Sequence, residues 1–262
     1  MKIYIATHKN YIFPQDELYA PLQVGGAADF TELRDNTGDN IAEKNPYFCE
    51  LTALYWAWKN SGEDVIGLVH YRRHFSKKSR SYRKSHGNMA SVLTMSEAAG
   101  LLKKADIIVP NKRRYHIESL YSHYNNTLIQ AKSHLDIARE LIVEKSPEYL
   151  PYLDETYCQT WGYMFNMAVM PKALLDDYCN FLFPVLFAME DIVDVSGMDA
   201  FSARLFGRVS EILFNVWVKK HQAEGMKVAE CRVIDMEPVN WPKKIAGFLS
   251  AKFFGKKYSK SM

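Results

Sequence analysis

The chain has 262 residues and a formal charge of +3, and 48% of its residues are hydrophobic, which fits one large α/β domain or two small ones. Its longest apolar run, residues 181–189, is too short for the about 20 residues of a membrane span, and the N-terminus lacks the pattern of a signal peptide. The four cysteines lie far apart with no CxxC pair, which argues against a zinc site and favours free thiols in a reducing cytoplasm.

The predicted elements alternate between strand and helix along the chain. Lys2–Thr7 is rich in β-branched and aromatic residues and predicts a first strand, after which a long loop is expected. Helical spacing over 45–60, with Asn45 and Pro46 suited to the first positions, predicts the first helix. Further strands are predicted at 65–69, 106–110, 164–170 and 226–234. Further helices are predicted from Ser96 to 104, at 133–145, after Pro171 and at 199–220, and a basic loop is predicted at 75–88. This order predicts one α/β domain over residues 1–241, with helices on both faces of a mixed, mostly parallel sheet.

Positive charge is concentrated in two parts of the chain. Between His70 and Arg114, twelve Lys and Arg residues accompany only two acids, Glu97 and Asp106. After Glu237 there are six Lys residues and no acid. Zones of this kind favour phosphate groups, anionic lipid or nucleic acid as partners.

The strand at 65–69 runs directly into charged residues. His70, Arg72 and Arg73 follow it, and ligands of open α/β sheets bind beyond the carboxyl ends of the strands. Guanidinium groups match phosphate oxygens in two-point contacts, so this strand end predicts a diphosphate site. The alternative is a solvated strand end whose arginines pair with nearby acids.

The end of the first strand could bind the rest of a nucleotide. Thr7 and His8 offer a hydroxyl and an imidazole there for a base, a ribose or a phosphate. The turn sequence RDNTGDN carries Asp35 and Asp39, whose carboxylates fit a ribose or a uracil edge. Capping of the next helix explains these two acids equally well.

Four blocks of the sequence resemble one bacterial glycosyltransferase family. They are DNTGDNIAEKNPYFCELTALYWAWKN, GLVHYRRHF, MFNMAVM and RLFGRVSEILFNVW, in this order between about Ile3 and Trp217. The family occurs in capsule, exopolysaccharide and O-antigen gene clusters and was long known only as an uncharacterised conserved domain. Members with an assigned activity are similar to galactofuranosyltransferases. The resemblance implies a GT-A-type, Rossmann-like fold, a UDP-sugar donor, and an acceptor glycan on a lipid diphosphate at the inner face of the plasma membrane.

The resemblance also implies roles for the residues at the strand ends. Thr7 and His8 would contact the nucleotide, and Asp35, Asp39 and Asn40 would lie near its uridine. His70, Arg72 and Arg73 occupy the position where many GT-A enzymes carry an Asp-x-Asp metal motif, which is absent here. Because protein cations could neutralise the leaving diphosphate, we expect transfer that needs no metal ion, with Mn²⁺ or Mg²⁺ dependence as the alternative.

An inverting reaction needs a carboxylate that removes the proton of the acceptor hydroxyl. In GT-A enzymes this acid is commonly near the start of the helix that follows an FN strand, here the position of Asp199, and Glu211 lies about three turns further on. Asp199 fits a helix cap equally well, and Glu211 fits an ion pair with Arg204 or Arg208. Both acids therefore stay candidates for the base.

Three residues near 161–166 are candidates for contacts with sugars. In related folds an Asn at the position of Asn166 faces the donor sugar, although a buried Asn bonded to backbone is as plausible. Trp161 and Tyr163 could stack on a sugar ring, and packing in an aromatic core is the alternative.

Residues 242–262 form a distinct basic tail. Apolar side chains at helical spacing with a rim of lysines favour an amphipathic helix on an anionic membrane surface, and a disordered tail or a helix docked on the body are the alternatives. The membrane-facing candidates are Lys243, Lys244, Phe248, Lys252, Phe253, Lys256 and Lys257.

Two other functions compete with glycosyl transfer. The basic zone at 70–114 could bind a nucleic acid, but the rest of the body is net acidic and no recognition motif occurs, so we expect no nucleic-acid partner. A catalytically inactive protein that binds sugar nucleotides would carry the same binding residues. We therefore expect a cytoplasmic, peripheral membrane glycosyltransferase.

Overall fold

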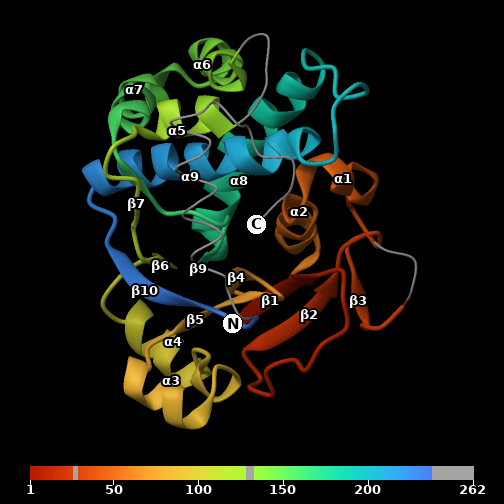
Figure 1. Ribbon diagram of the computed structural model, residues 1–262, viewed down its shortest axis with the longest axis vertical. Helices are drawn as coiled ribbons and strands as arrows, with labels where there is room; N and C mark the ends of the chain where they lie inside the picture. The colour runs from red at the N-terminus through yellow and green to blue at the C-terminus, as the bar shows by residue number, and fades with distance from the viewer. Residues whose placement is uncertain (26–28, 128–132, 238–262) are drawn as a thin grey trace.

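The computed structural model describes residues 1–25, 29–127 and 133–237, and its centre is an eight-stranded sheet in the order β3-β2-β1-β4-β5-β10-β6-β9 (Figure 1). The strands are Lys2–Thr7 (β1), Tyr19–Gln23 (β2), Leu33–Arg34 (β3), Val65–His70 (β4), Arg73–Ser76 (β5), Ile107–Pro110 (β6), Ala168–Pro171 (β9) and Val228–Asp235 (β10). Arg113–Arg114 (β7) and Trp161–Gly162 (β8) form a separate antiparallel pair.

The large sheet is mixed in strand direction. β1 is parallel to β2 and β4, β2 is parallel to β3, and β10 is parallel to β6, whereas β5 and β9 are antiparallel to the strands beside them. The prediction of a mixed, mostly parallel α/β sheet is confirmed: six of its eight described strands run in one direction, and β5 and β9 run against them. Only Tyr71 and Arg72 separate β4 from β5, and so short a connection reverses the chain.

Helices cover both faces of the sheet, as predicted. They are Asn45–Phe48 (α1), Leu51–Asn60 (α2), Arg80–His86 (α3), Met95–Leu102 (α4), Leu120–Thr127 (α5), His134–Lys145 (α6), Leu150–Cys158 (α7), Lys172–Glu190 (α8) and Leu205–Ala223 (α9). In Figure 1, α8 and α9 lie above the sheet with most of the other helices, and α3 and α4 lie below it. Each layer encloses its own apolar core, one around Phe48, Phe206 and Trp217 and the other around Ile3, Phe75 and Leu93.

Several elements differ from the predicted ones for local reasons. β2 and α3 lie in segments predicted to be loops, since Pro21 interrupts the strand pattern and α3 has no apolar face. α4 follows Thr94, which forms a reciprocal capping box with Glu97, so Ser96 lies inside the helix. The helix predicted over 45–60 is divided at Cys49, whose φ of 55° is incompatible with a continuous helix.

Two differences change the surroundings of candidate site residues. The strand predicted at 164–170 begins only at Ala168, because Phe165 and Asn166 have φ angles of 80° and 50°. The helix predicted from Asp199 begins at Leu205, because residues 199–204 form a turn and a 3-10 helix.

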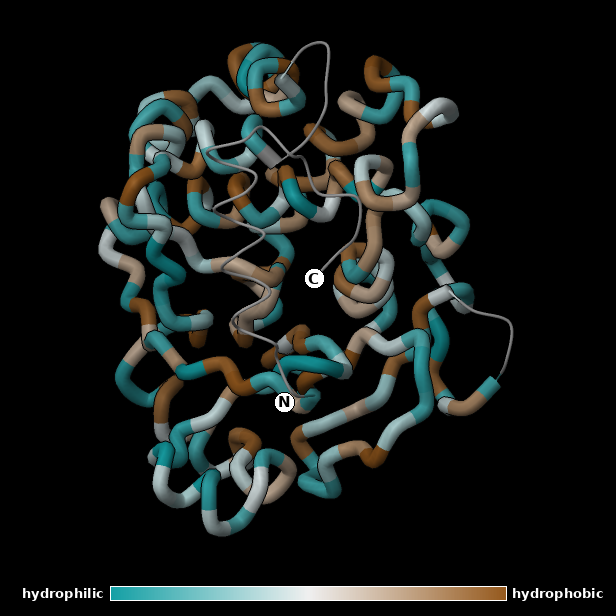
Figure 2. The backbone as a smooth tube through the Cα atoms, in the orientation of Figure 1, coloured by the Kyte–Doolittle hydropathy of each residue, from teal (hydrophilic) through white to brown (hydrophobic). Residues whose placement is uncertain are grey.

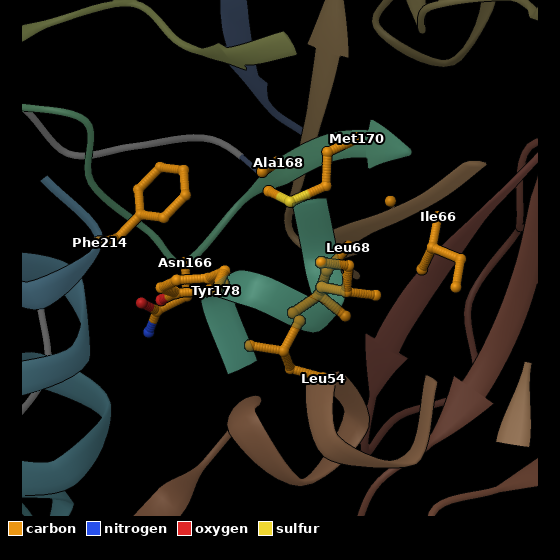
Figure 3. Close-up of a pocket in the computed structure, with 10 residues that line it drawn as sticks. Leu54, Ile66, Leu68, Asn166, Ala168, Met170, Tyr178 and Phe214 are labelled. Atoms are coloured by element: carbon orange, nitrogen blue, oxygen red, sulfur yellow. The ribbon is translucent and has the colours of Figure 1, made fainter. Parts of the chain in front are cut away.

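The apolar cavity between β4, β9 and the helical layer is too small to bind a sugar. Its volume is about 20 Å³, and its lining includes Leu54, Ile66 and Leu68. Figure 3 shows Asn166 at the margin of this cavity, with its amide directed away from Leu68 and toward α9. This cavity is therefore not a sugar-binding site.

Candidate active site

The carboxyl ends of β1 and β4 lie side by side, as the sequence predicts. The backbone N–H of Tyr71, which follows β4, donates to the carbonyl of Ala6 in β1 at 3.1 Å. The centroid of the Tyr71 ring is 4.9 Å from the His8 ring, 5.2 Å from Cζ of Arg72 and 5.8 Å from Nζ of Lys9. One imidazole and two cations therefore gather at the edge expected to bind a nucleotide.

A further arginine reaches this edge from the helical layer. Burial lowers the pKa of His8, and the charges of Lys9, Arg72 and Arg204 lower it further. Arg204 ends the 3-10 helix before α9, and its Nε donates to Sγ of Cys49 at 3.0 Å. From the sequence we considered Arg204 only as an ion-pair partner. The signal that could have found it is its four-residue spacing from a second arginine at the start of an amphipathic helix.

Most arginines at this edge have no carboxylate partner. Arg73 contacts Asp235, with 3.3 Å between Nε and Oδ1, so the alternative of pairing with nearby acids holds for this residue. Within the described ranges, no ion pair is formed by Arg72, Arg113, Arg204 or Arg208. Guanidinium groups without a carboxylate attract anions, and their donor geometry suits phosphate.

A half-buried carboxyl group lies among these arginines. Glu211 on α9 accepts a hydrogen bond from the backbone N–H of Phe165 at 2.7 Å. Burial and then the charge of Glu50 raise the pKa of Glu211 to about 7, against the opposing effects of the Phe165 N–H, Arg113 and Arg73. Glu211 therefore exchanges its proton near neutral pH, as a general base requires.

His70 is held as a neutral imidazole beside the same pair of acids. Its Nε2 donates to the carbonyl of Phe165, so this nitrogen carries the proton. Burial, Arg73 and Arg72 lower the pKa of His70, while Glu50 and the Phe165 carbonyl oppose them. His70 therefore acts as a fixed hydrogen-bond donor that orients the chain around Phe165.

The turn at Phe165 and Asn166 is a strained link that joins these groups. Both residues have left-handed φ angles, which are uncommon for residues other than glycine. The Asn166 Nδ2 donates to Glu50 Oε1 and to the carbonyl of Gly207, both at 2.8 Å, and its Oδ1 accepts from the Ser210 hydroxyl at 2.9 Å. The strain is thus maintained by bonds from β4, α9 and the segment before α2.

Replacing Asn166 by Ala is expected to destabilise the fold by about 2–4 kcal/mol. It leaves Glu50 and the Gly207 carbonyl without their donor and puts a Cβ without a compensating amide in the left-handed region. Asn166→Gly loses the same hydrogen bonds but tolerates the φ angle, so it should be more stable than Asn166→Ala by about 1 kcal/mol. Urea unfolding of the three proteins measures both values, and equal stability of the two variants would contradict the role of strain.

The sequence of the chain matches a known protein family. Residues 2–222 match the family described as a domain of unknown function, DUF4422. The chain belongs to this family. The matched range contains every site group described above, from the end of β1 to Glu211, whereas β10 and the basic tail lie outside it.

A solved structure supplies the functional comparison for this DUF4422 chain. It is the apo structure of WbbM, a bifunctional glycosyltransferase, with 30% sequence identity and a TM-score of 0.78. The match covers 90% of this chain and 45% of that chain, so the DUF4422 chain corresponds to less than half of WbbM. No curated protein matches the chain.

Asp35 lies at the same sheet edge, two strands from Thr7. Its carboxylate accepts from the Thr52 hydroxyl at 2.5 Å, and burial raises its pKa. The Thr7 hydroxyl donates to the carbonyl of Lys9 at 2.6 Å and so turns the chain after β1. Next to Asp35 is a polar hollow of about 230 Å³, lined by Gln23, Gly25, Asp29, Arg34, Asp35, Asn36 and Ala42.

Asp39 and Asn40 do not join this edge. Asp39 accepts from the Tyr55 hydroxyl at 3.2 Å, and its backbone N–H donates to Asn60 at the far end of α2, beside the start of β4. The Asn40 side chain accepts from the N–H of Ala42 at 3.2 Å. Both residues stabilise the loop that runs along α2.

Asp199 is exposed and makes only local bonds. Its carboxylate accepts from the N–H of Phe201 at 2.8 Å and from the N–H and hydroxyl of Ser202 at 3.1 and 2.7 Å. These bonds lower the pKa of Asp199. This geometry is that of a cap, the alternative considered for this residue.

The two aromatic candidates differ in access. Tyr163 is buried, and its hydroxyl donates to Glu230 at 3.2 Å. Trp161 is half-buried, with Nζ of Lys112 lying 4.2 Å from its ring centroid. A sugar at Trp161 would therefore have to displace Lys112. The membrane-facing candidates at 243–257 lie outside the described residues, and no helix of the described ranges is long and apolar enough to span a bilayer.

The residues at the expected metal position do not fit a divalent cation. His70 is a donor there, and Arg72 and Arg73 are permanently charged. In the part of the chain that the structure describes, no three His, Cys, Asp or Glu side chains are arranged to hold a metal ion. We therefore derive no reaction step through a metal.

Proposed function

We propose that this DUF4422 chain is a glycosyltransferase that moves a sugar from a UDP-sugar to a glycan acceptor. The observation that carries the proposal is Glu211, a half-buried carboxyl with a pKa of about 7 among arginines that lack carboxylate partners. Similarity to a bifunctional glycosyltransferase over 90% of the chain supports it.

The donor diphosphate would bind between His8, Arg72 and Arg204. Burial lowers the pKa of His8 at the end of β1, and the positive charges of Lys9, Arg72 and Arg204 lower it further. Phosphate oxygens would relieve the repulsion among these groups. The nucleoside would extend toward the polar hollow at Asp35, whose carboxylate suits a ribose or a uracil edge.

Transfer would invert the anomeric carbon. Glu211 takes the proton of the acceptor hydroxyl as its oxygen forms a bond to that carbon. The bond from the carbon to the UDP oxygen breaks, and UDP leaves with its new negative charge next to Arg72 and Arg204. Glu50 keeps the pKa of Glu211 high, while His70 orients the turn that binds the Glu211 carboxylate.

The acceptor would be a lipid-diphosphate-linked glycan of a bacterial surface polysaccharide. This part of the proposal, like galactofuranose as the donor sugar, rests on the sequence resemblance. It assigns the protein to the cytoplasmic side of the membrane.

A panel of UDP-sugars tests the function. The purified chain is incubated with each donor and a soluble acceptor glycan, and released UDP is measured. We expect one donor, with UDP-galactofuranose the first choice, to give acceptor-dependent release. Calorimetric binding of UDP without release from any donor would instead indicate an inactive binding protein.

Transfer is expected to persist in excess EDTA at more than about half of its initial rate. The reason is that arginines without carboxylate partners supply the charge that a metal would otherwise supply. Initial rates with EDTA, and after addition of Mn²⁺ or Mg²⁺, measure this. Complete loss of activity that Mn²⁺ restores would contradict metal-independent transfer.

A further inference from the structure

The fold places the basic residues of the zone at 70–114 in separate parts of the molecule. Arg72, Arg73 and Arg113 belong to the candidate active site. A second group surrounds α3, which lies below the sheet in Figure 1, on the opposite face from α8 and α9. We call it the α3 surface, and it consists of Lys77, Arg80, Arg83, Lys84 and Arg232.

α3 contributes nothing to the apolar core. None of its residues is buried, and all are exposed except the half-buried Arg83. Figure 2 colours the helix teal to white, without hydrophobic residues. A helix of seven residues is too short to be stable alone in water, and here its cap at Ser79 and its contact with residues 89–91 hold it. Its side chains are therefore available for a partner.

The charges of the α3 surface are not compensated. Burial and then the charges of Arg232 and Arg80 lower the pKa of Arg83, so the three guanidinium groups repel one another. The Nε of Arg83 is buried without a hydrogen bond, and none of the three arginines forms an ion pair with a described carboxylate. Lys78 differs, because its Nζ contacts Glu97 at 2.7 Å. A concentration of like charge on an unpacked helix indicates an anionic partner.

We propose that the α3 surface docks the chain on an anionic lipid bilayer. Several exposed cations on one helix can approach a bilayer together, and each adds to the attraction of an anionic surface. The inference concerns an interaction surface and does not depend on the proposed transferase activity.

The end of the described chain favours a lipid over a nucleic acid. The Asn88 amide, just after α3, donates to the carbonyl of Asp235 at 2.8 Å, and the N–H of Met236 donates to the carbonyl of Arg72. The described chain therefore ends next to the end of α3, and the segment that carries the six lysines after Glu237 continues from this point. The sequence of that tail combines lysines with apolar residues at helical spacing, which suits a bilayer surface and has no use on a nucleic acid.

Vesicle co-sedimentation of the full chain tests the proposal. The α3 variant carries Lys77→Gln, Arg80→Gln and Lys84→Gln, all at exposed positions. A control variant with the same change in net charge carries Lys59→Gln, Lys145→Gln and Lys227→Gln, which are exposed positions outside the α3 surface. Vesicles of phosphatidylcholine with phosphatidylglycerol are compared with vesicles of phosphatidylcholine alone, and circular dichroism confirms folding.

The wild type and the control are expected to bind the mixed vesicles equally and the neutral vesicles weakly. The α3 variant should bind the mixed vesicles at least about tenfold more weakly than the wild type. Equal weakening of both variants would overturn the proposal, since it would indicate only net charge. Undiminished vesicle binding by the α3 variant would also overturn it. If this variant had at the same time lost binding to a single-stranded oligonucleotide, the partner of the α3 surface would be a nucleic acid.

Discussion

Glu211→Gln is expected to lower the rate of sugar transfer about 100- to 10,000-fold while UDP affinity changes little. Gln retains an oxygen that can accept from the N–H of Phe165, now 2.7 Å from the carboxylate, so the turn keeps its support. It cannot take a proton from the acceptor hydroxyl. Initial rates and calorimetric titration with UDP measure the two quantities separately.

Asp199→Asn is the matched control for this change. Asp199 is exposed and caps a turn, so its variant should keep the rate within about twofold of the wild type. If Asp199→Asn were inactive and Glu211→Gln active, the assignment of the base would be reversed.

The pH dependence of both rate and stability follows from Glu211. The rate should rise with pH through about 7, because the ionised carboxylate is the base. The stability of the fold should change with pH in the opposite direction. Folding raises the pKa of Glu211 from 4.5 to about 7, so the contribution of this group to the free energy of unfolding is complete below about pH 4.5 and is lost as the pH rises through 7. Glu211→Gln should therefore gain stability relative to the wild type between pH 5 and pH 8, by about 3 kcal/mol at most.

Arg72→Ala and Arg204→Ala are each expected to weaken UDP binding about 10- to 100-fold. Each removes a guanidinium without a carboxylate partner from the proposed diphosphate position, and charge-assisted bonds to phosphate are among the stronger ones. Arg139→Ala is the control, because Arg139 pairs with Asp154 on an exposed surface. Calorimetric titration with UDP measures all three affinities.

The same two variants have a readout that is independent of UDP. Both arginines lower the pKa of His8 by charge repulsion, so the pKa of His8 should rise in each variant. Histidine NMR titration follows it in the free protein. An unchanged pKa of His8 together with unchanged UDP affinity would place the diphosphate elsewhere.

Local patterns in the sequence predicted the sheet edge at which the candidate site residues gather. β1 and β4 were predicted because an apolar strand pattern is a property of a few consecutive residues, and their charged ends at His8 and at 70–73 are as local. Parallel neighbours bring such ends together, which the pairing of β1 with β4 confirms. The same patterns missed β2 and did not show which strands run against the others, because pairing partners and chain reversals are not local.

The choice between two acids was beyond the sequence. Asp199 and Glu211 are both acids near the start of one amphipathic pattern, and either position fits a base. Folding exposes Asp199 and gives it local donors, while it leaves Glu211 half-buried near Glu50 and in contact with the Phe165 N–H. A pKa depends on desolvation and on charges brought from distant parts of the chain, so no local pattern carries it.

The sequence by itself therefore determined the α/β class, the end of β4 as the charged edge, and the membership of His8, His70, Arg72 and Arg73 in it. Only the tertiary structure decided that Arg204 joins them, that Phe165 and Asn166 form a strained turn instead of a strand, and that Glu211 is the acid with the raised pKa. The physical reason is that strand pattern and side-chain charge are fixed residue by residue. Burial, left-handed backbone and the summed field of remote charges exist only once the layers have packed.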